Sequence, residues 1–230
     1  MWVNDPEEIK KRVNTKVALF EKSNQVQLPD SIKNRIEGLN VNTEIRDLLR
    51  LLCSEVIKFQ NEGLAHYYLE IIEEAVKSST RINDQDKSDK LIQSIVKNVY
   101  KLIAYKDEYE VARLFLSPEI ADEVKNLPQS TGKASWHFQP PFLRSMGLKR
   151  KLKLPFALAI PIMKILSKGK FLRGTWFDPF GYAEVRKVER LIRDRYIEEI
   201  LAALQSLSTD TYPQIPVSYT HLTLPTNREV

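Results

Sequence analysis

Apolar residues recur every three or four positions along most of the first 115 residues, which is the spacing of one face of an α-helix. The pattern predicts a helix over Asp5–Glu21, with Pro6 at its first turn. A short second helix is predicted over residues 29–38. A longer one follows the capping sequence Asn42-Thr43-Glu44 and keeps its apolar spacing to Ile57.

The next apolar face runs over Leu64–Lys77, and we expect Gly63 to kink or divide the helix before it. A long helix is predicted from Leu91 to Leu114. Residues 117–126 have the signals of one further short helix.

Beyond this point the pattern changes. Residues 128–180 are irregular and rich in proline and aromatic residues, with a minor hairpin as one reading of Lys133–Phe142. A charged, amphipathic helix follows Gly181. Convincing period-two alternation is missing from the sequence, so we predict a mainly α fold, a multi-helix domain with an irregular Pro/aromatic-rich segment around 128–180.

Polarity suggests the domain organisation. Ser78–Asp89 is the most polar stretch and is the best linker candidate. The first ten residues of Val217–Val230 match a reading frame of a common transposon-type sequencing adapter. We interpret 217–230 as unstructured, translated adapter sequence outside the fold.

Composition is that of an ordinary soluble protein, with 43% hydrophobic and 28% charged residues among 230. The single cysteine, Cys53, excludes an internal disulfide and an iron–sulfur cluster held by four thiolates of this chain. It lies in an apolar run and is expected to be buried and inert. The longest apolar run, Leu154–Met163, is short and interrupted by prolines, and Met1–Phe20 has no signal-peptide pattern. These features predict a cytoplasmic protein.

Charge is unevenly distributed around a net value of +5. Segment 124–177 contains eleven Lys and Arg residues and no acid. Such a segment could bind nucleic acid or a membrane surface, face an acidic partner domain, or form a solvated face. Its scattered aromatics do not make a stacking platform, which disfavours nucleic acid.

Candidate chemistry is sparse. His66 and His137 are the histidines outside the adapter-like end, and with Cys53 they form no zinc pattern. Phosphate-binding glycine loops and a nucleophile elbow are also missing from the sequence. We expect His66 to meet a carboxylate on a helix face and His137 to bond its own loop. The sequence predicts no catalytic, cofactor-binding or metal-binding residue in this chain.

The block KDEYEVAR, Lys106–Arg113, places its charges three and four positions apart on shared helix faces. One interpretation is an ion-paired helix docked by Tyr105, Tyr109, Val111 and Ala112. The other is a set of contacts with a neighbouring domain, made by Lys106, Asp107, Glu108 and Arg113.

The block LRGTWFDPFGY, Leu172–Tyr182, combines glycines, a proline and several aromatics. We expect Asp178 and Pro179 to start a helix there while the aromatics hold its entry. The residues of this predicted structural corner are Arg173, Gly174, Asp178, Pro179, Phe180, Gly181 and Tyr182.

Three blocks in order resemble the C-terminal domain of the fused indolepyruvate:ferredoxin oxidoreductases, in the 2-oxoacid:ferredoxin oxidoreductase group. They are KLIAYKDEYEVARLF (101–115), WHFQPPFL (136–143) and LRGTWFDPFGYAEVRKVERLI (172–192). The stretch KFQNEGLAHYYLEII (58–72) is similar to a further helix of that group. The resemblance covers roughly Val56–Leu204 and is much weaker over 1–55. It therefore implies an N-terminal helical segment, 1–55, and a C-terminal helical domain of that group, 56–216. This chain has Trp176 where the group often has proline, and Gln139 where it often has alanine.

The resemblance implies a parent enzyme that decarboxylates an aryl-pyruvate to acyl-CoA with thiamine diphosphate and iron–sulfur clusters, passing electrons to ferredoxin. It places that chemistry in other domains, and we expect this chain to be truncated at both ends. The leading hypothesis is a non-catalytic accessory domain, inactive alone, whose partners are the catalytic domains and, as a further candidate, a dimer mate, with no membrane attachment. The alternative is a stand-alone helical protein that binds nucleic acid or an acidic surface through segment 124–177.

Overall fold

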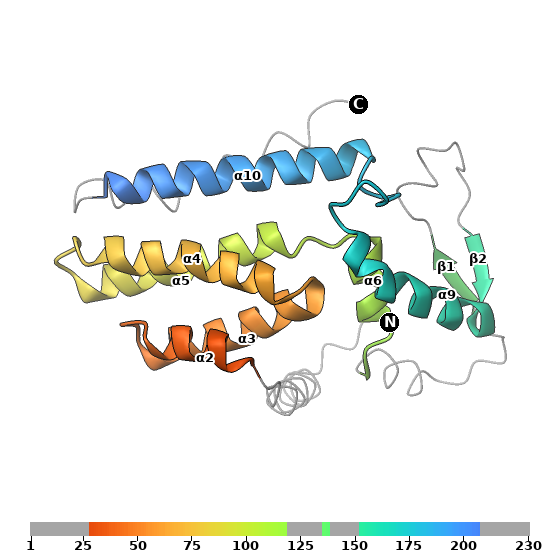
Figure 1. Ribbon diagram of the computed structural model, residues 1–230, viewed down its shortest axis with the longest axis horizontal. Coiled ribbons are helices and arrows are strands. Elements are labelled where there is room, and N and C mark those ends of the chain that lie inside the picture. Colours follow the sequence, from red (N-terminus) through yellow and green to blue (C-terminus); the bar gives the residue numbers. More distant parts are fainter. Residues whose placement is uncertain (1–27, 119–134, 139–151, 208–230) are drawn as a thin grey trace, which may run out of the picture.

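The computed structural model describes residues 28–118, 135–138 and 152–207 (Figure 1). Most of these residues are helical, which confirms the predicted mainly α fold. In chain order the elements are α2 (Asp30–Glu37), α3 (Thr43–Phe59), α4 (Glu62–Ser79), α5 (Gln85–Ile103), α6 (Glu108–Phe115), β1 (Ser135–Phe138), β2 (Leu152–Pro155), α9 (Phe156–Lys168), the 3₁₀ turn η1 (Gly169–Leu172) and α10 (Glu184–Gln205).

Four helices begin with the same local device. The side chain of Asn42 accepts a hydrogen bond from the backbone N–H three residues further on, at 2.9 Å, and Asn61 does the same for α4. Asp84 and Asp107 cap α5 and α6 in this way, at 3.2 and 2.8 Å. Each cap satisfies a backbone donor that has no partner inside its helix, a contribution of about 1 kcal/mol.

The core joins α2, α3, α4 and α5 with the second half of α10, which lies alongside α4 and α5 (Figure 1). Tyr68 is fully buried there, and its hydroxyl donates to the carbonyl of Val96 at 2.9 Å. α10 contributes Tyr196, Ile197 and Ile200, whereas its first half extends past this core. That first half helps to build the candidate site.

The division between α3 and α4 differs slightly from the prediction. α3 ends at Phe59, and Asn61 caps the new helix, so the break lies at Gln60-Asn61. Gly63 lies inside the first turn of α4. The cap, and not the glycine, separates the two helices.

The predicted long helix from Leu91 to Leu114 is wrong. α5 ends at Ile103, and α6 begins only at Glu108. Apolar periodicity continues through both helices, but the Asp107 side chain turns back to cap α6. This cap fixes an extended backbone at Asp107, which a continuous helix would not allow.

The polar stretch 78–89 is mostly helix. α4 extends through Ser79, α5 starts at Gln85, and both Ser78 and Ser79 are buried. The expected boundary at 55/56 falls inside α3, whose two halves belong to the same hydrophobic cluster. The predictions for 5–21, 119–126 and 217–230 lie outside the described residues.

The expected hairpin over 133–142 is replaced by a wider pairing. β1 lies within that range, but its antiparallel partner is β2, with Ser135 opposite Pro155 and Phe138 opposite Leu152. β2 leads directly into α9, which packs against α6 and continues through Pro161. Among the described helices, none combines the length and apolar character needed to cross a bilayer.

Candidate functional site

The two sequence blocks meet at Arg173. Its guanidinium binds both carboxylate oxygens of Asp107, with Nε–Oδ2 and Nη2–Oδ1 distances of 2.5 and 2.8 Å. The two side chains are only 7% and 4% exposed. A bidentate ion pair of this kind is directional as well as strong, so it holds the corner in one orientation relative to α6.

Arg173 also closes the end of α3. Its Nη1 donates to the backbone carbonyl of Phe59 at 2.6 Å and to the side chain of Gln60 at 2.8 Å, while the guanidinium carbon stands 3.7 Å from the centre of the Phe59 ring. The last carbonyls of a helix have no partner within it and attract cations. One side chain therefore joins the end of α3, the start of α6 and the corner.

Lys170 acts on the same helix end. Its ammonium donates to the carbonyls of Lys58 at 2.8 Å and Ile57 at 3.4 Å, and burial lowers its pKa. Lys170 and Arg173 both belong to the basic segment 124–177. These two cations are therefore directed into the molecule, where they satisfy backbone carbonyls of α3.

A second contact between the blocks joins Tyr109 and Asp178. The Tyr109 hydroxyl donates to Asp178 Oδ1 at 3.0 Å, and its ring meets that of Phe180 edge to face with centres 5.1 Å apart. Burial, together with the adjacent carboxylate, raises the pKa of Tyr109. Both side chains are buried, so this hydrogen bond holds the turn around Asp178 against α6.

The prediction that Asp178 and Pro179 start a helix is wrong. α10 begins at Glu184, with Ala183 in the capping position. Asp178 instead accepts hydrogen bonds from the N–H groups of Phe180 and Gly174, at 3.1 and 3.3 Å, in addition to that from Tyr109. The carboxylate therefore organises the turn itself.

Glycines make this turn possible. Gly174 has φ of +75°, a conformation that strains other residues. A Cβ on Gly181 would lie 2.8 Å from Asp178 Oδ2, and one on Gly169 would lie 2.9 Å from the Tyr109 ring. The remaining corner residue, Tyr182, donates its hydroxyl to the carbonyl of Trp176 at 2.7 Å.

The charged residues of KDEYEVAR lie in different surroundings. Glu108 faces Arg186 of α10 at 3.3 Å, and both side chains are almost completely buried. Arg113 binds Glu110 and, from α3, Glu55, at 2.6 and 2.9 Å. Together with the Arg173 pair, these contacts place Asp107, Glu108 and Arg113 in ion pairs within the chain.

Lys106 differs from its neighbours because it is exposed and has no ion-pair partner within the described ranges. Of the four residues expected to contact a neighbouring domain, only Lys106 is directed to solvent in this way. The bridging partners Phe59, Glu55 and Arg186 were not predicted from the sequence. Each lies more than 50 positions from the block it contacts.

His66 contacts a guanidinium and not the expected carboxylate. Its Nδ1 lies 2.8 Å from Arg35 Nη1, and Arg35 also binds both oxygens of Glu73 at 2.8 Å. Because arginine only donates, Nδ1 is the acceptor. Cys53 is fully buried, and burial raises its pKa to about 12, so it is an unreactive thiol. The His137 side chain lies outside the described part.

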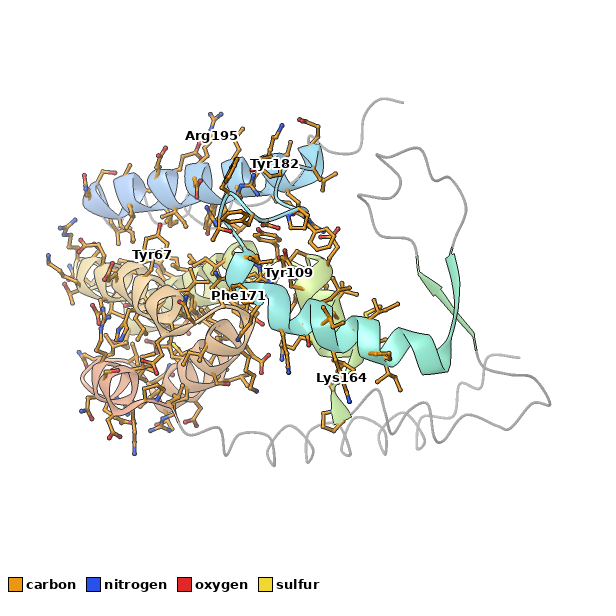
Figure 2. The ribbon with its side chains drawn as sticks, turned by 45° about the vertical axis from the view of Figure 1, so that its right-hand side comes forward. Tyr67, Tyr109, Lys164, Phe171, Tyr182 and Arg195 are labelled. Atoms are coloured by element: carbon orange, nitrogen blue, oxygen red, sulfur yellow. The ribbon has the colours of Figure 1, made fainter. Side chains whose placement is uncertain are left out.

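An open groove of about 960 Å³ runs beside this network. The α3–α4 junction, Ile103 and Tyr105 after α5, and the corner with the first half of α10 form its walls. Trp176, Tyr182 and Tyr67 supply exposed aromatic surface, and Lys187, Arg190 and Arg193 supply positive charge. Figure 2 shows Tyr67 pointing from α4 toward α10.

Next to the groove, the corner exposes large apolar side chains. Phe171, Trp176 and Phe177 are 71%, 81% and 72% exposed, and the last two rings meet with centres 5.3 Å apart. Along α10, Val185 and Leu191 are more than half exposed. In the described part of the chain, no three His, Cys, Asp or Glu side chains lie close enough together to hold a metal ion.

These features define a helical domain in which a buried ion-pair network supports an exposed aromatic corner and a basic groove. The chain belongs to a family of unknown function, DUF6537, whose profile matches residues 45–218. Neither the curated proteins nor the solved structures contain a match to it.

Proposed function

We propose that this chain is a non-catalytic accessory domain of a cytoplasmic 2-oxoacid:ferredoxin oxidoreductase of the indolepyruvate type, and that its role is to pack against the catalytic domains. The observation that carries the proposal is the exposed aromatic corner on a rigid support. Phe171, Trp176 and Phe177 present their rings to solvent beside the fully paired Arg173.

Exposed aromatic residues of this size favour a protein interface. Phe and Trp each bury about 150–250 Å² when they are covered, and such residues dominate the energetics of interfaces. Large contiguous apolar patches on soluble proteins commonly mark interaction sites. The ion pairs beneath the corner hold its backbone, so little ordering entropy opposes association.

The internal pairing of the charges refines the expected contact. Asp107, Glu108 and Arg113 stabilise the domain itself, and Lys106 remains the member of that set available to a partner. Because the other three charged residues are paired within the chain, we assign the main contact between domains to the aromatic corner. The catalytic domains are the first candidate partner, and a dimer mate is the second.

The resemblance of the three sequence blocks supports the choice of parent enzyme. In that enzyme, thiamine diphosphate and iron–sulfur clusters belong to other domains and supply the decarboxylation and electron-transfer chemistry. This chain supplies a surface. Within this chain, Arg173 of one block and Asp107 of another form a buried ion pair, so the two blocks depend on each other for stability.

Two measurements test the proposal. The purified chain, mixed with indolepyruvate, coenzyme A and a low-potential electron acceptor, is expected to show no turnover, and clear turnover would overturn the accessory role. The chain is also expected to bind the catalytic polypeptide of such an enzyme, detected by sedimentation velocity. The double variant Trp176→Ser, Phe177→Ser is expected to lose this binding while keeping its helical spectrum.

A further inference from the structure

The groove beside the aromatic corner is lined by cationic and aromatic side chains. We propose that it receives an acidic polypeptide segment, anchored by an apolar side chain, from the protein against which the domain packs. This inference rests on the proposed function and deepens it, because it names the surface and the chemistry of the partner.

Charge favours an acidic occupant. Four cations line the groove, Arg173, Lys187, Arg190 and Arg193, against the single carboxylate of Asp178. Both oxygens of Asp178 already accept hydrogen bonds from the corner and α6. Among the lining residues, a carboxylate entering the groove therefore meets more positive than negative charge.

The cations differ in how far they are already paired. Asp107 holds Arg173, Glu184 holds Lys187 at 2.7 Å, and Asp194 holds Arg193 at 2.7 Å. Arg190 donates one Nη2 bond to the carbonyl of Gly181, at 2.7 Å, and has no carboxylate partner in the described ranges. Its remaining donors make it the main anchor for an incoming carboxylate.

Positive charge also converges on the groove lining at Tyr105. Burial and, after it, the negative charge of Asp107 raise the pKa of Tyr105, while the positive charges of Arg173, Arg190 and Arg193 oppose that rise. The guanidinium carbon of Arg186 lies 5.7 Å from the centre of the Tyr105 ring, although Arg186 does not line the groove. The groove thus has a cationic lining next to a phenol that can donate a hydrogen bond.

Shape favours a polypeptide over a small metabolite. Small-molecule sites bury most of their ligand's surface. This groove is instead flanked by exposed aromatic side chains: Tyr67 is 42%, Tyr182 55% and Trp176 81% exposed. Such walls would be covered only by an occupant that extends past them, with an apolar side chain between the rings and carboxylates along α10.

The test uses three fluorescein-labelled helical peptides of equal length and measures anisotropy with the full chain. The first peptide is an amphipathic helix with glutamate on one face and leucine on the other. The second has lysine in place of every glutamate, and the third has glutamine in place of every leucine. The first is expected to bind at least about tenfold more tightly than either other peptide, with affinity that falls as salt rises. Equal binding of the three, or no binding, would overturn the inference.

Variants locate the site. Arg190→Glu is expected to weaken the first peptide about tenfold, and Arg193→Glu to weaken it less. The matched control is Arg195→Glu, on the same helix, since Arg195 pairs with Glu199 and lies on the side of α10 away from Tyr67 (Figure 2). An equal loss in the control would mean general charge attraction and would refute a groove site. Circular dichroism checks that each variant is folded.

The inference and the proposed function can fail separately. If the catalytic polypeptide still binds the Arg190→Glu variant with unchanged affinity, the groove is not the docking site, although the accessory role stands. If the acidic peptide binds but the catalytic polypeptide does not, the groove chemistry stands and the assigned parent enzyme is wrong. A photo-crosslinker at position 67 is expected to label an acidic peptide of the partner, and labelling of a basic one would contradict the inference.

Discussion

Replacement of Arg173 by methionine should be among the most damaging single changes in this domain. It removes the partner of Asp107, whose side chain is 4% exposed, and it frees the Phe59 carbonyl and the Gln60 side chain. Breaking a buried ion pair from one side costs about 3–5 kcal/mol, because the remaining charge stays buried and unpaired. A domain of this kind has about 5–15 kcal/mol of total stability, so the loss is a large share.

Urea unfolding followed by circular dichroism at 222 nm measures this loss. The matched control, Arg195→Met, removes an arginine whose side chain is 68% exposed and is expected to cost less than about 1 kcal/mol. Asp107→Asn keeps an oxygen that can cap α6 but removes the charge. The double variant Arg173→Met, Asp107→Asn should therefore be at least about 1 kcal/mol more stable than the sum of the two single losses predicts. Additive losses, or a loss below about 1 kcal/mol for Arg173→Met, would refute the reasoning.

Three further predictions test other parts of the domain. Gly181→Ala places a methyl group 2.8 Å from Asp178 and is expected to lower the free energy of unfolding by about 1–3 kcal/mol. The control Gly38→Ala makes no contact closer than 3.4 Å and should change that free energy by less than about 1 kcal/mol. Equal effects of the two changes in urea titrations would contradict the packing argument. Tyr109→Phe removes one hydrogen bond to a buried carboxylate and should cost about 1–3 kcal/mol by the same titration; no loss would argue against that bond. Cys53 should react with a thiol reagent at pH 8 only on unfolding. The pKa of the Cys53 thiol is about 12 in the folded chain, above its ordinary value of 9.0, so the thiol ionises first in the unfolded chain and the free energy of unfolding should fall as pH rises from about 9 toward 12. Cys53→Ala should show a smaller fall, and the same pH dependence in both proteins would contradict the assignment.

Features set by neighbouring residues were predictable from the sequence. The cap at Asn42 depends on a backbone N–H three positions away, and the short helix over Asp30–Glu37 depends on its own flanking residues. Amphipathic spacing likewise indicated the apolar faces of α3, α4 and α5. Local physical chemistry is enough for such elements, because the partners lie within one helical turn.

Features that depend on distant partners were missed. The spacing of apolar residues continues from α5 into α6, although Asp107 breaks the helix by capping α6. The ion pair that buries Asp107 comes from Arg173, 66 positions further along the chain. The Asp178-Pro179 pair has the local signature of a helix start, yet Tyr109, 69 positions earlier, takes the carboxylate. His66 contacts Arg35 of α2, and the sequence around His66 gives no indication of this partner.

The candidate site shows the same division. The crowding of glycine and aromatic residues in Leu172–Tyr182 indicated a structural corner, and its own composition was sufficient for that. The basic groove was not predicted, because its walls come from three separate parts of the chain. Which charges are consumed internally could not be read from spacing alone, since their partners lie on α3 and α10.

Association with the catalytic polypeptide tests the central claim most directly. The catalytic polypeptide is chosen from the same genome by its thiamine diphosphate and cysteine-cluster motifs, and sedimentation velocity measures its binding to this chain. The account predicts a stoichiometric complex that is lost in the Trp176→Ser, Phe177→Ser variant and kept in Arg195→Met. A chain that stays unbound at all concentrations, or a complex indifferent to the aromatic corner, would contradict it.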